Sequence, residues 1–217
     1  MYKLIFFVVA LPFSGFSQQL PVRNEPRHHN VFENGYVRIL DVFLAPGDTT
    51  RFHLHNTPSI FTTFTRTATG SQIEGAYPSH DVSVAGKSWY DSLSKPRFHR
   101  VWNEDTSWFH VMDIELTGTP STKPLPLKDP ALDLIFQQDK ANGYRLTGIE
   151  GKPLQLPPSQ TGYLLLCTGE TTLHYSLDGN KDSRVMRAGH YLWVGAGQRL
   201  TIESTGATSN LVLLQMR

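Results

Sequence analysis

The sequence predicts an all-β protein of the sandwich or barrel type. Short segments rich in β-branched and aromatic residues recur along the chain, among them "YVRILDVFL", "WFHVMDIEL" and "HYLWVGA". Turn-forming segments such as "APGD", "LDGNKD" and "STGATS" separate them, and hardly any segment repeats its apolar residues with a helical period. Many short strands with regular turns between them are typical of β-sandwiches and β-barrels.

Residues 1–17 have the layout of a secretory signal peptide. Lys3 precedes an apolar run at 4–13, and the small residues Gly15 and Ser17 follow it. The run is too short to span a bilayer, and the alternative is a buried N-terminal strand. We expect cleavage after Ser17 and export, to the periplasm or the medium. No membrane attachment is expected after that, because no cysteine directly follows the run to carry a lipid.

The mature chain is predicted to be neutral. The sequence has 20 Lys and Arg and 19 Asp and Glu, and the signal peptide removes Lys3 alone, which leaves 19 of each. A neutral chain gives no basis for binding nucleic acid or an anionic membrane surface. The one cysteine, Cys167, cannot form an intramolecular disulfide and is expected to be a small core residue.

A proline-rich segment, "TGTPSTKPLPLKDP" at 117–130, is predicted to be an extended linker. It divides the mature chain into residues 18–116 and 131–217, each of an ordinary domain size. Each half also contains Asn-Gly-Tyr, at 34–36 and 142–144, which leads through a strand-like run to a turn. We therefore expect a duplicated β unit.

The segment "PGDTTRFHLHN" places His53 and His55 one residue apart in a predicted strand. Side chains alternate along a strand, so both imidazoles point to one side, with Cα atoms about 6.6 Å apart. Two imidazoles at this separation can converge on one metal ion, which then needs at least a third protein ligand. The alternative is a polar, solvated strand face.

The surrounding spacing resembles the two motifs of the cupin superfamily. Five residues separate Gly47 from His53, and His99 stands four residues before Asn103 in "SKPRFHRVWN". The resemblance covers most of residues 30–116. It implies a small double-stranded β-barrel, and together with the duplication it implies a bicupin of two tandem, jelly-roll-like barrels. It also implies His53, His55 and His99 as ligands of a divalent transition metal (Fe, Mn, Zn, Ni or Cu).

The sequence departs from the family pattern in two places. The family's Pro-x-Gly falls here on Ser94 and Pro96, and the glutamate that usually follows the second histidine after three or four intervening residues is replaced by Ser59 and Ile60. Glu74 is the nearest downstream glutamate, but its spacing fits poorly. A site without this carboxylate should bind less tightly or prefer other metals, although cupins with three-histidine sites exist, notably thiol dioxygenases.

Further residues are expected beside the ligands or in the pocket wall: Asn103, His110, Phe64, Trp102 and Trp108. The alternative for each aromatic residue, and the favoured one for His110, is an ordinary core position. His28 and His29 precede the first predicted strand, where they either close one end of the barrel or form an exposed pair. His80, His174 and His190 carry no spacing argument.

The second half keeps a glycine spacing like that of the second cupin motif, at Gly189 and Gly197, but its ligand position is Leu200. It contains no His-x-His. We expect a degenerate barrel that is structural or shapes an apolar pocket.

The sequence is compatible with two functions. One is a metal-dependent enzyme of the oxygenase or isomerase type that acts on a small molecule. The other is a non-catalytic module that binds a sugar or another small metabolite. A homodimer is compatible with either function.

Overall fold

The computed structural model describes residues 19–119, 125–149, 152–205 and 210–216. The predicted signal peptide and the middle of the predicted linker lie outside these ranges. The described chain contains eighteen strands and one short 3-10 turn, η1 (Val22–Asn24). No helix within the described ranges is long and apolar enough to cross a membrane.

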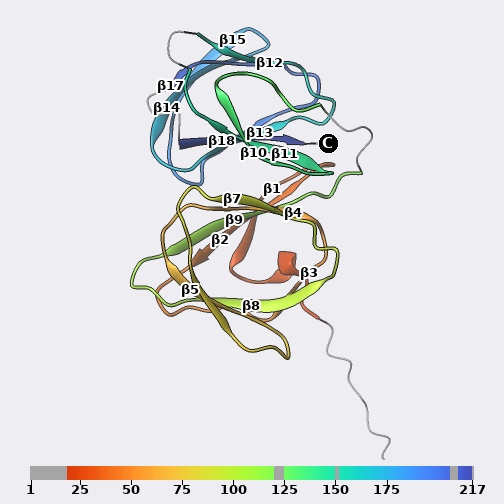
Figure 1. The fold of residues 1–217 in the computed structure, drawn as a ribbon, viewed down its shortest axis with the longest axis vertical. Coiled ribbons are helices and arrows are strands. Elements are labelled where there is room, and N and C mark those ends of the chain that lie inside the picture. Colours follow the sequence, from red (N-terminus) through yellow and green to blue (C-terminus); the bar gives the residue numbers. More distant parts are fainter. Residues whose placement is uncertain (1–18, 120–124, 150–151, 206–209, 217) are drawn as a thin grey trace, which may run out of the picture.

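Nine strands form the first barrel, drawn red to green in Figure 1. They are β1 (His28–Glu33), β2 (Arg38–Leu44), β3 (His53–His55), β4 (Ser59–Thr63), β5 (Ala68–Ile73), β6 (Ser79–Val82), β7 (Ser88–Asp91), β8 (Arg97–Asn103) and β9 (Phe109–Glu115). Their sheets have the orders β1-β2-β9-β4-β7 and β3-β8-β5-β6, and all the strand pairs within them are antiparallel.

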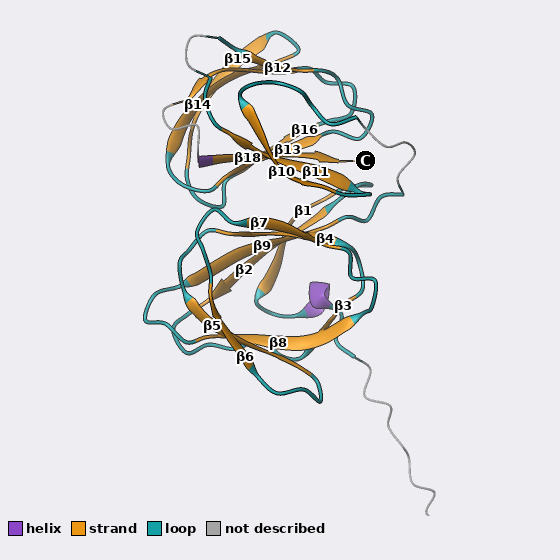
Figure 2. Cartoon of the chain, in the orientation of Figure 1, coloured by secondary structure: helices purple, strands orange, loops and turns teal. Residues whose placement is uncertain are grey.

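Nine further strands form the second barrel. They are β10 (Leu132–Gln137), β11 (Ala141–Leu146), β12 (Leu154–Leu156), β13 (Tyr163–Cys167), β14 (Thr171–Leu177), β15 (Asn180–Met186), β16 (Tyr191–Val194), β17 (Leu200–Thr205) and β18 (Leu211–Met216). The sheet orders are β10-β11-β18-β13-β16 and β12-β17-β14-β15. Figure 2 shows strand and loop in both barrels and confirms the all-β, two-barrel prediction.

The pairing of the strands shows the duplication. Adding nine to each strand number of the first barrel gives the strand orders of the second. Even a register shift repeats, between Asn30 and Phe32 in β1 and between Leu134 and Phe136 in β10. The two Asn-Gly-Tyr segments do not correspond, because the first lies between β1 and β2 and the second lies inside β11.

The two barrels share a hydrophobic core. It contains Ile60, Met112 and Ile114 of the first five-stranded sheet and Leu164 and Leu214 of the second, all completely buried. In Figure 1 these two sheets face each other across the middle of the molecule. One face of each sheet therefore lines its own barrel, and the opposite face packs against the other barrel.

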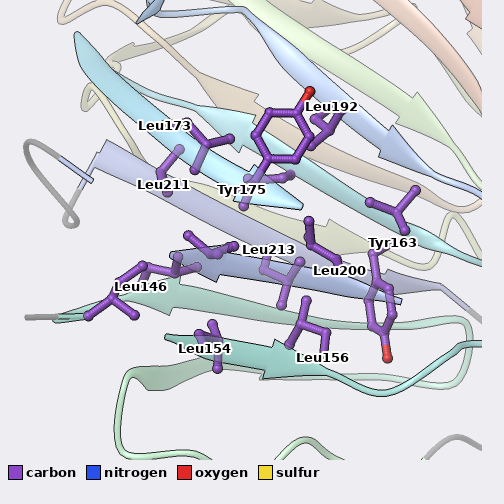
Figure 3. Packing of buried hydrophobic residues seen from close by; sticks show 14 of the residues in the cluster. Leu146, Leu154, Leu156, Tyr163, Leu173, Tyr175, Leu192, Leu200, Leu211 and Leu213 are labelled. Carbon is purple, nitrogen blue, oxygen red and sulfur yellow. The ribbon is translucent and has the colours of Figure 1, made fainter. Parts of the chain in front are cut away.

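The interiors of the two barrels differ. The second is filled by a cluster of seventeen buried residues, and Figure 3 shows leucines and tyrosines of this cluster packed between its strands. The first has a much smaller apolar cluster of five buried residues, namely Val42, Leu44, Phe61, Phe109 and Val111. It encloses a cavity of about 500 Å³.

Candidate metal centre

Strands β3 and β8 bring the three predicted ligands together. His53 pairs with His99 across these antiparallel strands, and His55 lies two residues along β3 on the same face. His53 and His55 are buried, and the ring centroids of the three histidines are 4.8–4.9 Å apart. The alternation of side chains that the sequence analysis used therefore turns these imidazoles into the barrel rather than toward solvent.

His28 is a fourth histidine at the same place, and the sequence analysis did not include it among the ligands. It opens β1 and is buried, and its ring centroid lies 4.7 Å from that of His53. One potential ligand atom from each of His28, His53 and His55 lies within 4.8 Å of the others. His28 and His29 do not form an exposed pair, because His28 is buried and only His29 is exposed.

Acceptors behind two of the rings fix which nitrogen can bind a metal. His53 Nδ1 donates to the carbonyl oxygen of Arg51 at 2.8 Å, and His28 Nδ1 donates to Glu25 Oε2 at 2.9 Å. These bonds place the proton on Nδ1 and leave the lone pair of Nε2 for a ligand. His53 Nε2 and His99 Nε2 are buried, with no hydrogen-bond partner among the described residues.

Such unpaired ring nitrogens are costly in a protein interior, and a metal ion would satisfy them. Imidazole nitrogens also suit Fe, Ni, Cu and Zn. The donor set therefore fits a divalent transition metal.

The electrostatics keep two of these imidazoles neutral. Burial, together with the neighbouring His28 and His55, lowers the pKa of His53 to about 3. Burial, together with the neighbouring His55 and His53, lowers the pKa of His99 to about 2. A neutral imidazole is the form that coordinates a metal, so both rings are ready to bind at neutral pH.

Glu25 supports the site from the N-terminal side. Burial alone would raise the pKa of its carboxyl, but hydrogen bonds from His28 and from the amides of Arg27 and Arg51 bring the pKa below its usual value. The ionised carboxylate holds His28 and the chain before β3 together. A glutamate three residues before a histidine is the signal in the sequence that could have pointed to this pair.

The glutamate that the family usually has is absent from its usual positions. Ser59 is buried and donates to the carbonyl oxygen of Thr57, Ile60 packs into the core between the barrels, and Glu74 is exposed. A different carboxylate is present. Asp113 Oδ2, on β9, lies 3.3 Å from His55 Nδ1. No motif or spacing in the sequence marks Asp113.

The cavity lies beside the histidines and is mainly apolar. Phe61 and Trp89 form part of its wall and stack with their ring centroids 5.3 Å apart. Arg97 also lines it, with its guanidinium 5.7 Å from the centre of the Phe61 ring and a 2.6 Å hydrogen bond to Asp91. A volume of about 500 Å³ is within the range of small-molecule sites.

Three of the residues expected near the ligands lie elsewhere. Asn103 donates to the carbonyl oxygens of Leu44 and Ser107 and so holds a turn. Trp102 is three residues after His99 on β8, which puts it on the outer face, and Trp108 is 57% exposed. None of the three is among the cavity-lining residues.

Phe64 and His110 lie on the side of the sheet that faces the other barrel. Phe64 belongs to the shared core, and the His110 ring stacks on Phe43 with centroids 4.0 Å apart. His110 Nε2 is 2.7 Å from Asp41 Oδ1. His110 is therefore the satisfied, buried histidine that its strand position favoured.

The second barrel has apolar residues at the corresponding places. Leu154 pairs with Ile202 as His53 pairs with His99, and Leu156 pairs with Leu200. All four are buried in its core, as the absence of ligands in the sequence of this half predicted.

No family model matches the chain, and no curated protein does. Solved structures do. A cupin 2 conserved barrel domain protein from Leptotrichia buccalis is 10% identical, with a TM-score of 0.56 over 86% of both chains. A salicylate 1,2-dioxygenase from Pseudaminobacter salicylatoxidans is 10% identical, with a TM-score of 0.55 over 83% of this chain and 70% of that one.

The protein YhaK from Escherichia coli is 13% identical, with a TM-score of 0.52 over 87% of this chain and 90% of that one. At such identities the likeness concerns the fold. It bears out the resemblance found in the sequence: the chain has the fold of the cupin superfamily, in two tandem barrels.

Proposed function

We propose that the first barrel binds one divalent transition-metal ion through His28, His53, His55 and His99 and presents it to a small molecule in the adjoining cavity. The observation that carries this proposal is the set of buried ring nitrogens without partners, clustered at one end of the cavity. A bound ion would supply a Lewis acid or, if it were Fe, Mn or Cu, a redox centre.

The residues of the chain divide the remaining work. Glu25 and the Arg51 carbonyl orient two ligand rings, and the barrel excludes bulk water from them. Phe61, Phe109 and Trp89 offer aromatic surface to the small molecule. A mainly apolar body with one polar end toward the histidines is the ligand that suits this lining.

An oxygenase or isomerase reaction at this centre is the enzymatic form of the proposal. Among the solved structures of the same fold is one titled a salicylate 1,2-dioxygenase, which shows that the fold can carry oxygenase chemistry. A non-catalytic module for a small metabolite is the alternative. It is favoured by the absence of the family's usual glutamate, whose positions hold Ser59 and Ile60.

The test is elemental analysis of untagged protein after expression with Fe, Mn, Zn, Ni and Cu each supplied. We expect about one equivalent of one metal, lost in His53→Ala and in His99→Ala but kept in His174→Ala, since His174 lies on β14 of the second barrel. Wild-type protein without metal under all five conditions would refute the proposal. Oxygen uptake with candidate small molecules then separates the enzyme from the binding module.

Export is part of the same proposal and rests on the N-terminal sequence alone. Protein isolated from its native host should begin near Gln18, by N-terminal sequencing. Intact Met1 on the folded protein would show that residues 1–17 are retained.

A further inference from the structure

Asp113 is a buried carboxylate without a hydrogen bond among the described residues. Its side chain is 1% exposed, and neither carboxylate oxygen has a hydrogen-bond partner among the described residues. His55 Nδ1, 3.3 Å away, is likewise buried without a hydrogen bond, because the two atoms are close but poorly aligned. An isolated buried carboxylate is strongly unfavourable, so a chain that keeps one is expected to use it.

The second barrel provides an internal comparison. Asp113 lies between Leu40 of β2 and Phe61 of β4, and the corresponding position of β18, between Tyr144 and Leu165, is Leu213. Leu213 is buried in the filled core, as Figure 3 shows.

The histidines are replaced in the same way. By the same strand pairing, His28, His53, His55 and His99 correspond to Leu132, Leu154, Leu156 and Ile202. The barrel that lacks the four clustered histidines thus also lacks the carboxylate.

A neighbouring carboxylate behaves differently. Glu115, two residues further on β9, forms a 2.7 Å hydrogen bond with Arg38. Its counterpart is Gln215, which accepts a hydrogen bond from Asn142, the counterpart of Arg38. A polar pair at this position is common to both barrels and belongs to the shared scaffold. The carboxylate of Asp113 belongs only to the barrel with the histidines.

We propose that Asp113 is the positioning carboxylate of the metal centre: it accepts the Nδ1 proton of His55, directs Nε2 of that ring to the ion, and offsets part of the ion's charge. It does for His55 what Glu25 does for His28 and the Arg51 carbonyl for His53. It supplies from β9 the negative charge that Ser59 and Ile60 of the adjacent β4 do not. This inference rests on the proposed metal site.

The experiment compares metal binding by chelator-treated wild type, Asp113→Asn and Asp41→Asn. Asp41 is the matched control, because it also pairs with a buried histidine on the same sheet, but on the face toward the second barrel. Loss of a partner behind a ligand typically weakens metal binding 10–100-fold. We expect a loss of this size in Co²⁺ or Zn²⁺ affinity for Asp113→Asn and none for Asp41→Asn, by competition with a chelator.

Two further measurements distinguish positioning from a general role in folding. In the Co²⁺ protein, the exchangeable Nδ1 proton of His55 should give a shifted NMR signal that is lost or exchanges faster in Asp113→Asn. The metal-free Asp113→Asn protein should melt no lower than metal-free wild type, because neither carboxylate oxygen of Asp113 has a hydrogen bond among the described residues that the substitution would remove.

Three results would overturn the inference. Equal metal affinity in wild type and Asp113→Asn would refute it and leave the metal site standing. A changed coordination number in the Co²⁺ absorption spectrum would make Asp113 a direct ligand instead. No metal binding by the wild type would overturn the site and this inference together.

Discussion

Four imidazoles face one another inside the first barrel, and the energetics of the centre follow from this crowding. Protonating His53 or His99 places a positive charge in a largely buried cluster beside other imidazoles. The low pKa values of His53 and His99 express that cost. At the scale of the residue, the metal-free site is therefore sensitive to acid.

The metal-free protein should lose stability as the pH falls below about 6.5. In the unfolded chain both histidines take up protons near their ordinary pKa, whereas in the native state they stay neutral down to about 3 and about 2. Between these values the unfolded state binds more protons, so stability rises with pH, by about 1.4 kcal/mol per pH unit for each histidine. Urea unfolding at pH 7.5, 6.0 and 5.0 measures the slope, which His99→Leu should reduce. A flat profile would contradict these pKa shifts.

A fourth ligand can be tested with an adjacent pair of histidines. His28 is buried against His53, whereas His29, the next residue, is exposed on the other face of β1. His28→Ala should weaken metal binding by more than the 10–100-fold typical of a partner behind a ligand. His29→Ala should leave it unchanged. Equal affinities in chelator competition would remove His28 from the site.

At the scale of the element, strand β8 must present its two faces to two environments. His99 faces inward, whereas the indole of Trp102 lies on the outer face over Gly70 of the paired strand β5. A Cβ atom built on Gly70 would overlap the indole ring. Gly143 of β11 lies under Phe136 in the same manner. An aromatic ring over a cross-strand glycine therefore fixes the pairing in both barrels.

Gly70→Ala should destabilise the first barrel by about 1–3 kcal/mol, because the indole must move away. Metal affinity should stay as in wild type, since Trp102 does not line the cavity. Chemical unfolding and chelator competition measure the two quantities. Gly35→Ala is the control, because a Cβ there meets no atom within 4 Å. Similar stability losses for the two variants would show that the indole has no part in the effect.

For the whole molecule, the core between the barrels makes them one unfolding unit. Leu164 is completely buried in it, and Leu164→Ala should lower the free energy of unfolding by about 2–5 kcal/mol. Three of the four tryptophans lie in the first barrel, so tryptophan fluorescence mainly reports the unfolding of that barrel. Although the substitution is in the second barrel, the fluorescence transition should shift and should coincide with the transition seen by far-UV circular dichroism. Val185→Ala, at an exposed position, is the control. Two separate transitions would argue against the shared core.

The fold could be predicted because strand periodicity and turn residues are local signals. That the histidines of β3 and β8 lie together could be predicted because they carry a spacing. His28 and Asp113 carry none: they reach the site from β1 and β9 through the closure of the barrel. Trp108 and His110 could not be assigned to a face, because a shift of one residue reverses the two sides of a strand and nothing local marks the inner side of β9.

The hollow interior of the first barrel has a mechanical consequence. A chain with one cysteine has no intramolecular disulfide to close this barrel, and its apolar cluster contains only five buried residues. An ion held as proposed would cross-link β1 to β3 and β8, positions far apart along the chain. Such a metal cross-link between distant strands stabilises the folded chain much as a long-range disulfide does. Metal binding would then also make the protein more resistant to thermal unfolding and to proteolysis. The metal-free form would be the one that proteases degrade.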